Sequence, residues 1–136
     1  MARSLEMARV LVVDDELSSR LTLQTLLEAG GYSVDVAGSA EEAFSKLDQG
    51  QYELVLSEAE IDSPQAGLQV LSYARVKPYQ PATALVTAYK EAKASRYPSG
   101  DEQQVSINTE NVSALLGRIA DLIAMRVQRR ASRAAQ

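Results

Sequence analysis

The chain has 136 residues, which is enough for one domain with a sizeable core. It contains no cysteine and no histidine, so disulfides, zinc sites of the usual Cys/His type and Ser–His or Cys–His nucleophilic pairs are excluded. The formal net charge of −4 argues against general nucleic-acid binding, and no apolar run approaches the roughly 20 residues of a membrane span. We expect a cytoplasmic globular domain after a loose leader over residues 1–8, which is too short and too polar for a signal peptide.

The first predicted element is a strand over residues 10–13, where three of the four apolar residues are β-branched. Such a run is typical of a strand buried on both faces, which implies a parallel sheet covered by helices. Asp14, Asp15 and Glu16 follow directly. Ligands of such sheets bind beyond the carboxyl ends of the strands, and adjacent carboxylates repel one another unless a cation or a proton intervenes. The sequence therefore predicts a pocket for a hard cation such as Mg²⁺.

Helical and extended patterns alternate after these acids. A helix is predicted over residues 18–29 and is ended by the glycine pair 30–31. Alternating apolar and polar residues over 32–36 predict an edge strand. Ser39 and Glu42 have the spacing of a capping box and predict the start of a second helix. The face of the first helix is expected to consist of Leu17, Leu21, Leu23, Leu26 and Leu27.

The second half of the chain continues the same alternation. Strands are predicted over 52–57, 83–87 and 103–107, and helices over about 68–76, weakly over 88–97, and from 112 onward. Five strand–helix repeats with right-handed crossovers predict a doubly wound α/β fold. Parallel strands would bring the polar groups at their carboxyl ends to one edge of the sheet: Asp14, Asp15, Glu58 and Thr87.

The last helix has the clearest pattern, an apolar stripe at the 3.6 period that then turns basic. We interpret the basic stripe as a solvated helix end, where cations suit the negative end of the helix dipole; contact with a partner or a nucleic acid is the alternative. The helix is expected to extend beyond the sheet, which divides the chain into a domain over 9–125 and a basic extension over 126–136. The basic stripe consists of Arg126, Arg129, Arg130 and Arg133.

Four segments, VLVVDDE, YELVLSE, PATALVTA and NVSALLGRI, resemble those of bacterial response-regulator receiver domains, over nearly the whole chain. The resemblance implies a flavodoxin-like, CheY-like fold: a five-stranded parallel sheet in the order 2-1-3-4-5 with five helices. It also implies Mg²⁺ binding and transfer of a phosphoryl group from a histidine kinase to an aspartate. By position, Asp14, Asp15 and the backbone carbonyl of Glu60 would hold the metal. Glu58 stands at the phosphoacceptor position, and Thr87, followed by Ala88, matches the hydroxyl that contacts the phosphoryl group.

The departures from the family pattern are informative. The acceptor is a glutamate, the loop after it is one residue longer, the family's lysine aligns with Asn108, and its aromatic switch residue aligns with Val105. The extra methylene of Glu58 displaces its carboxylate by about 1 Å or more, which can cost on the order of a hundredfold in rate. Loss of the lysine removes a cation from the place where negative charge develops. The group of Asp14, Asp15 and Glu58 would then need a cation, or one carboxyl with a raised pKa.

Our leading hypothesis is a degenerate receiver that is not an enzyme and acts by binding signalling partners, a histidine kinase or a downstream effector. Glu58 would be poorly phosphorylated and would mimic the phosphorylated state with a single charge. A homodimer through the last helices is a further expectation from the resemblance. One alternative is a receiver that takes phosphate on Glu58, Glu60 or Asp62, and another is a Mg²⁺-dependent phosphate-processing enzyme. A flavin or nucleotide domain is disfavoured because no glycine-rich phosphate-binding motif follows a strand.

Overall fold

Five parallel strands form one sheet in the computed structural model, which describes residues 8–88, 103–107 and 111–134. The strand order is β2-β1-β3-β4-β5, so the predicted order and the edge position of β2 are confirmed. The strands are β1 (Arg9–Val13), β2 (Ser33–Ala37), β3 (Leu54–Ser57), β4 (Ala82–Ala88) and β5 (Gln104–Ile107).

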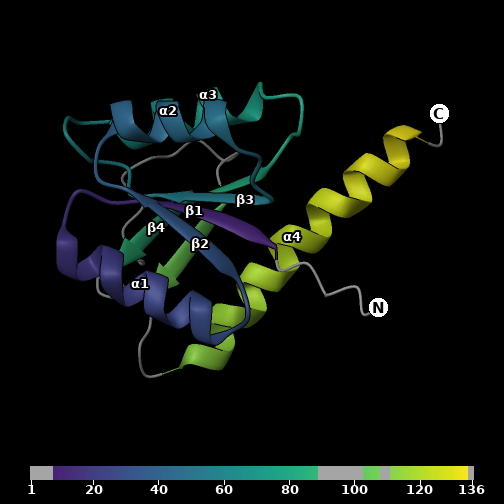
Figure 1. Cartoon of the computed structure of the whole chain (residues 1–136). Coiled ribbons are helices and arrows are strands. Elements are labelled where there is room, and N and C mark those ends of the chain that lie inside the picture. Colours follow the sequence, from purple (N-terminus) through teal and green to yellow (C-terminus); the bar gives the residue numbers. More distant parts are fainter. Residues whose placement is uncertain (1–7, 89–102, 108–110, 135–136) are drawn as a thin grey trace.

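Helices cover both faces of the sheet (Figure 1), with α2 and α3 on one side and α1 and α4 on the other. The third helix begins two residues earlier than predicted. The leader up to residue 7, most of the helix predicted over 88–97 and the turn after it lie outside the described residues. The described helices are α1 (Leu17–Ala29), α2 (Ala40–Gln49), α3 (Ala66–Arg75) and α4 (Val112–Ala134).

Strand β1 shows how the sheet builds two cores. Val10 and Val12 pack into the cluster shared with α1 and α4, whereas Leu11 and Val13 pack into the cluster shared with α2 and α3. All four side chains are buried, because successive side chains of a strand point to opposite faces and both faces are covered. Asp14 follows this buried run and therefore lies where the chain leaves the packed interior, at the edge of the sheet.

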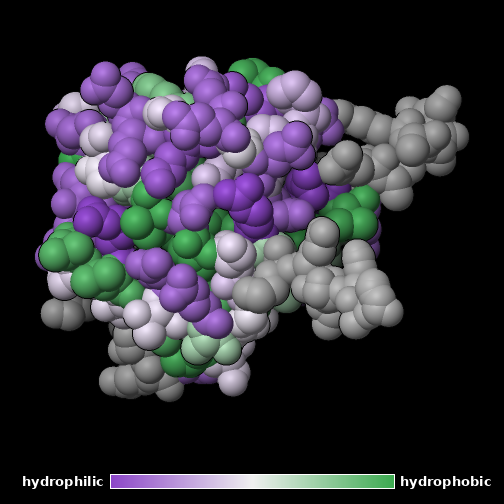
Figure 2. Space-filling model, in the orientation of Figure 1, coloured by the Kyte–Doolittle hydropathy of each residue, from purple (hydrophilic) through white to green (hydrophobic). Residues whose placement is uncertain are grey.

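The expected apolar face of α1 is wrong in part. Leu23 and Leu27 are buried, but Leu17 is 58% exposed and Leu21 is 48% exposed. Residues 21 and 23 lie about 200° apart around a helix of 3.6 residues per turn, so these leucines cannot share one stripe. Figure 2 shows hydrophobic surface over the beginning of α1, on a face of the molecule that is otherwise largely hydrophilic.

The helix ends refine the predicted caps. The Ser39 hydroxyl accepts a hydrogen bond from the Glu42 N–H at 3.1 Å, as predicted, but the Glu42 carboxylate accepts from the Gly38 N–H at 2.8 Å instead of from Ser39. After α1 it is Gly31, with φ of 99°, that adopts the left-handed conformation. Asn111 precedes α4 and caps it, since its side-chain oxygen accepts a hydrogen bond from the Ala114 N–H at 3.0 Å.

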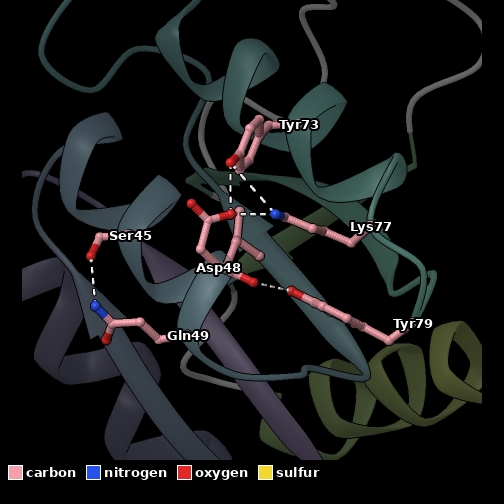
Figure 3. Close-up of polar contacts among 7 residues, drawn as sticks. Ser45, Asp48, Gln49, Tyr73, Lys77 and Tyr79 are labelled. Carbon is pink, nitrogen blue, oxygen red and sulfur yellow. Dashed lines mark hydrogen bonds and ion pairs between the residues drawn. The ribbon is translucent and has the colours of Figure 1, made fainter.

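A polar cluster joins the end of α2 to α3 and the loop after it (Figure 3). Tyr73 donates a hydrogen bond to Asp48 Oδ1 at 2.6 Å, and Lys77 forms an ion pair with the same carboxylate. The ammonium of Lys77 also lies 4.6 Å from the centre of the Tyr73 ring. Tyr79 donates to the Leu47 carbonyl at 2.8 Å. These contacts fix the chain entering β4 relative to α2.

Helix α4 continues past the sheet as one long helix (Figure 1). Our interpretation of its arginine stripe as solvated is wrong for Arg126, which is only 8% exposed. The guanidinium donates hydrogen bonds to the carbonyl oxygens of Tyr79 at 2.7 Å and Gln80 at 2.9 Å. The side chains of Arg129, Arg130 and Arg133 lie outside the described part of the structure. Among the described residues, no helix has the length and apolar character needed to span a membrane.

Candidate functional site

The predicted site residues follow three neighbouring strands at the same edge of the sheet. Strand β3 lies between β1 and β4, and Val13 is level with Ser57, which is level with Leu85. Asp14 and Glu58 therefore leave the sheet side by side. Their backbones are held in place, since the Asp14 N–H donates to the Ala37 carbonyl at 3.0 Å and the Glu58 N–H to the Val13 carbonyl at 3.1 Å.

Asp14 is the buried acid of this edge, with 5% of its surface exposed, whereas Asp15 is exposed. The Asp14 carboxylate accepts a hydrogen bond from the Glu16 N–H at 3.0 Å. Burial raises the pKa of Asp14, and the negative charges of Asp15 and Glu16 add to this; the hydrogen bond and the charge of Arg20 act in the opposite direction. A cation bound at this edge would stabilise the ionised form of Asp14.

Arg20 is a residue of this site that the sequence analysis missed. Its guanidinium donates a hydrogen bond to the Asp14 carbonyl at 2.9 Å, and it lies close to Gly38 at the end of β2. It sits one turn into α1, six residues after Asp14, so a helix leaving the strand end brings it back over the acids. That spacing is the signal that could have revealed it.

The loop after β3 is held against the start of α3. The Gly67 N–H donates to the Ala59 carbonyl at 2.8 Å, and a Cβ atom at position 67 would lie 1.6 Å from the Glu58 carbonyl oxygen. Gln65, just before the helix, has a positive φ of 69°. Asp62 reaches across to α2, where its carboxylate accepts from the Ala40 N–H at 3.2 Å. Glu58 itself is half-buried, and Glu60 is exposed.

The remaining predicted site residues lie on β4 and β5. Thr87 and Ala88 form the end of β4 and are paired with Ser106 and Ile107; of their side chains nothing is described. Val105, at the position of the family's aromatic residue, is buried in the core shared with α1 and α4. Asn108 lies outside the described residues.

The expected group of three carboxylates is not found. Within the ranges that the structure describes, no three His, Cys, Asp or Glu residues gather closely enough to hold a metal ion. The backbones of Asp14 and Glu58 are neighbours, but Asp14 is turned onto the Glu16 N–H and Asp15 is exposed. The carboxylate oxygens of Asp14 and Asp15 are of the kind that Mg²⁺ prefers as ligands.

A model of the response regulator receiver domain family matches residues 10–97. The gliding motility regulatory protein of Myxococcus xanthus is 36% identical over 78 residues, which cover 57% of this chain and 10% of that protein. The chain thus spans about a tenth of that relative's length.

Solved structures agree on the fold. A CheY-like receiver domain protein from Methanospirillum hungatei superposes with a TM-score of 0.75 at 23% identity, over 91% of this chain and 99% of the other. A response regulator of Thermotoga maritima, solved in complex with Mg²⁺ and BeF, has a TM-score of 0.67 at 29% identity, over 85% and 99%. The flavodoxin-like fold is confirmed. Because the family match covers more than half of its residues, this protein belongs to the response regulator receiver domain family.

Proposed function

We propose that this chain is an atypical receiver of two-component signalling that acts by binding partner proteins and is not an enzyme. One observation carries the proposal: a glutamate, Glu58, occupies the position directly after β3, beside Asp14 at the carboxyl edge of the sheet. That is the place where the family accepts a phosphoryl group. Asn108, in place of the lysine, supports the same conclusion.

The packing around Glu58 gives a reason why the site cannot adjust to the longer side chain of glutamate. The backbone at Glu58 is fixed on one side by its hydrogen bond to Val13 and on the other by Gly67, which touches its carbonyl. The backbone therefore cannot retreat to compensate for the extra methylene. A misplacement of about 1 Å costs on the order of a hundredfold in rate. We infer that Glu58 is a poor acceptor whose fixed negative charge mimics the phosphorylated state.

A weak Mg²⁺ site is part of the proposal, formed by Asp14, Asp15 and the backbone carbonyl of Glu60. When bound, the metal would neutralise negative charge on an incoming phosphoryl group. Asp14 and Asp15 supply the carboxylate oxygens, and the buried Asp14 is the ligand that most needs a counter-ion. The likeness to the Mg²⁺-bound Thermotoga maritima protein supports this assignment.

The partners that we propose are a histidine kinase or a downstream effector protein in the cytoplasm, with a second copy binding through the last helices. Leu17 and Leu21 support a protein-binding role, since these large apolar side chains are exposed beside the acidic edge. Exposed apolar residues beside a functional edge commonly mark a contact surface.

Phosphorylation is tested by incubating the chain with Mg²⁺ and acetyl phosphate and measuring intact mass. We expect no phosphate adduct on the wild type and a detectable one on Glu58→Asp, which restores the family's acceptor. An adduct on the wild type that disappears in Glu58→Gln would contradict the proposal and favour Glu58 as a working acceptor. An adduct that persists in Glu58→Gln would point to Glu60 or Asp62. Asp62 is the less favourable of these two because its carboxylate is engaged by α2.

One observation favours the enzyme alternative. Arg20 brings a cation to the edge that holds Asp14, and phosphate chemistry needs such a charge. Mg²⁺-dependent phosphate release from a generic ester, lost in both Arg20→Gln and Asp14→Asn, would support a phosphate-processing enzyme.

A further inference from the structure

The charges of this chain are divided unevenly along the sequence. Residues 112–136 hold five of the 14 Lys and Arg residues and one of the 18 Asp and Glu residues, so this segment carries +4 and the rest of the chain −8. The segment that contains the last helix is therefore basic, whereas the rest of the chain is acidic.

The arginine positions at the end of α4 lie, by helical periodicity, on the same side of the helix as its buried residues. Leu115, Ile119, Leu122 and Arg126 form its buried stripe, and at 3.6 residues per turn positions 129, 130 and 133 continue the same stripe. Figure 1 shows that the end of α4 extends beyond the sheet, and along this part the sequence of the stripe changes from apolar residues to arginines.

The acidic counterpart is the carboxyl edge of the sheet. Asp15, Glu16, Glu41 and Asp62 are all exposed there. Asp62 lies beside the start of α2, which carries Glu41, because its carboxylate accepts a hydrogen bond from the Ala40 N–H. Apolar side chains lie beside both charged surfaces: Leu17 and Leu21 beside the acids, and Met125 and Val127 on α4.

The two charged surfaces lie at opposite ends of the molecule. Arg126 contacts the backbone of residues 79–80, just before β4 begins, whereas the acids follow the strand ends. A five-residue strand spans roughly 16 Å, about twice the Debye length at physiological salt. The arginine positions at the end of α4 therefore lie too far from the acidic edge of their own chain to neutralise it.

We propose that the arginines at positions 129, 130 and 133 of α4, beyond the buried Arg126, bind the acidic carboxyl edge of a second copy of this chain. We choose a second copy of the chain as the binding partner because the two surfaces carry opposite charges and both include exposed apolar residues. The contact joins two different surfaces, so it is head-to-tail and either closes into a ring or extends as a chain. It covers the edge that holds Asp14 and Glu58, so self-association and partner binding at that edge would compete.

Analytical ultracentrifugation of the whole chain tests the proposal. We expect concentration-dependent association in about 50 mM salt that is largely lost in about 500 mM salt. Arg129→Gln/Arg130→Gln should weaken association on the order of tenfold. Ala124→Glu/Gln128→Glu is the matched control, because it changes the net charge by the same amount on the opposite, exposed face of the same helix and should have little effect.

A charge swap identifies the acidic surface. Arg129→Glu/Arg130→Glu and Glu16→Lys/Glu41→Lys should each fail to self-associate, and a mixture of the two should associate again. A monomeric wild type in low salt would overturn the proposal. So would equal weakening by the control variant, or a mixture that stays dissociated while both variants remain folded by circular dichroism.

Discussion

The backbone of Gly67 lies directly against the carbonyl oxygen of Glu58: a Cβ atom built at position 67 would lie 1.6 Å from that oxygen and 2.6 Å from its carbon. Glycine is the residue that permits such a close approach. The contact joins the start of α3 to the residue at the acceptor position. It makes the geometry of the candidate site depend on a residue nine positions along the chain.

Gly67→Ala should therefore destabilise the protein and displace Glu58. Backbone atoms cannot move aside as a side chain can, so we expect a loss of about 3 kcal/mol in the free energy of unfolding, measured by urea denaturation. Gly117→Ala is the control. A Cβ atom at position 117, which is exposed within α4, would have no atom within 4 Å. The substitution should raise the free energy of unfolding by up to about 1 kcal/mol, because alanine has the higher helix propensity. Equal effects of the two substitutions would contradict the packing argument.

Asp14 should lower stability when it is ionised. Burial raises its pKa, so the folded state holds the proton more tightly than the unfolded state, where the ordinary value is 3.8. Stability from this residue consequently falls as the pH rises from 3.8 through the raised value, and stays low above it. Asp14→Asn removes the buried charge and should stabilise the chain at neutral pH by about 1 kcal/mol, within the range common for single stabilising substitutions. The two proteins should become equally stable at low pH; a constant difference across the pH range would refute this cause.

Mg²⁺ should stabilise the wild type by neutralising the same edge. A metal present at tenfold its dissociation constant adds about 1.4 kcal/mol, visible as a rise in Tm that chelation reverses. Asp14→Asn/Asp15→Asn should remove the rise, whereas Asp48→Asn, an exposed aspartate at the far end of α2, should keep it. An equal change in Tm on adding Mg²⁺ to the wild type and to the double variant would contradict a Mg²⁺ site at Asp14 and Asp15.

Arg126 should matter for stability despite its charge. It is buried and donates to two backbone carbonyls in the loop before β4. Arg126→Met keeps the apolar stem but leaves these acceptors without their donor, so we expect a loss of about 2 kcal/mol in denaturant unfolding. Gln128→Met, on the exposed side of the same helix, should stay within about 0.5 kcal/mol of the wild type. A neutral Arg126→Met would restore the interpretation of this arginine as a solvated helix end.

The sequence by itself determined the architecture and predicted the positions of the site. The apolar run 10–13 and the acids after it located a buried strand and its functional end, because local periodicity reports how a segment will be covered. The alternation of strands and helices, with the handedness of crossovers, predicted a doubly wound α/β fold, and the resemblance to receiver domains supplied the sheet order that the structure confirms. Asp14, Glu58 and Thr87 could be assigned to one edge on the same basis.

Only the tertiary structure decided which side chains meet. It separated the buried Leu23 and Leu27 from the exposed Leu17 and Leu21, placed Arg20 on the Asp14 carbonyl, buried Arg126 against a loop 46 residues earlier, and pressed Gly67 onto Glu58. These contacts depend on the distance and angle between elements far apart in the chain. A local sequence pattern indicates the face of an element on which a residue lies. It does not indicate which residue of another element packs against that face.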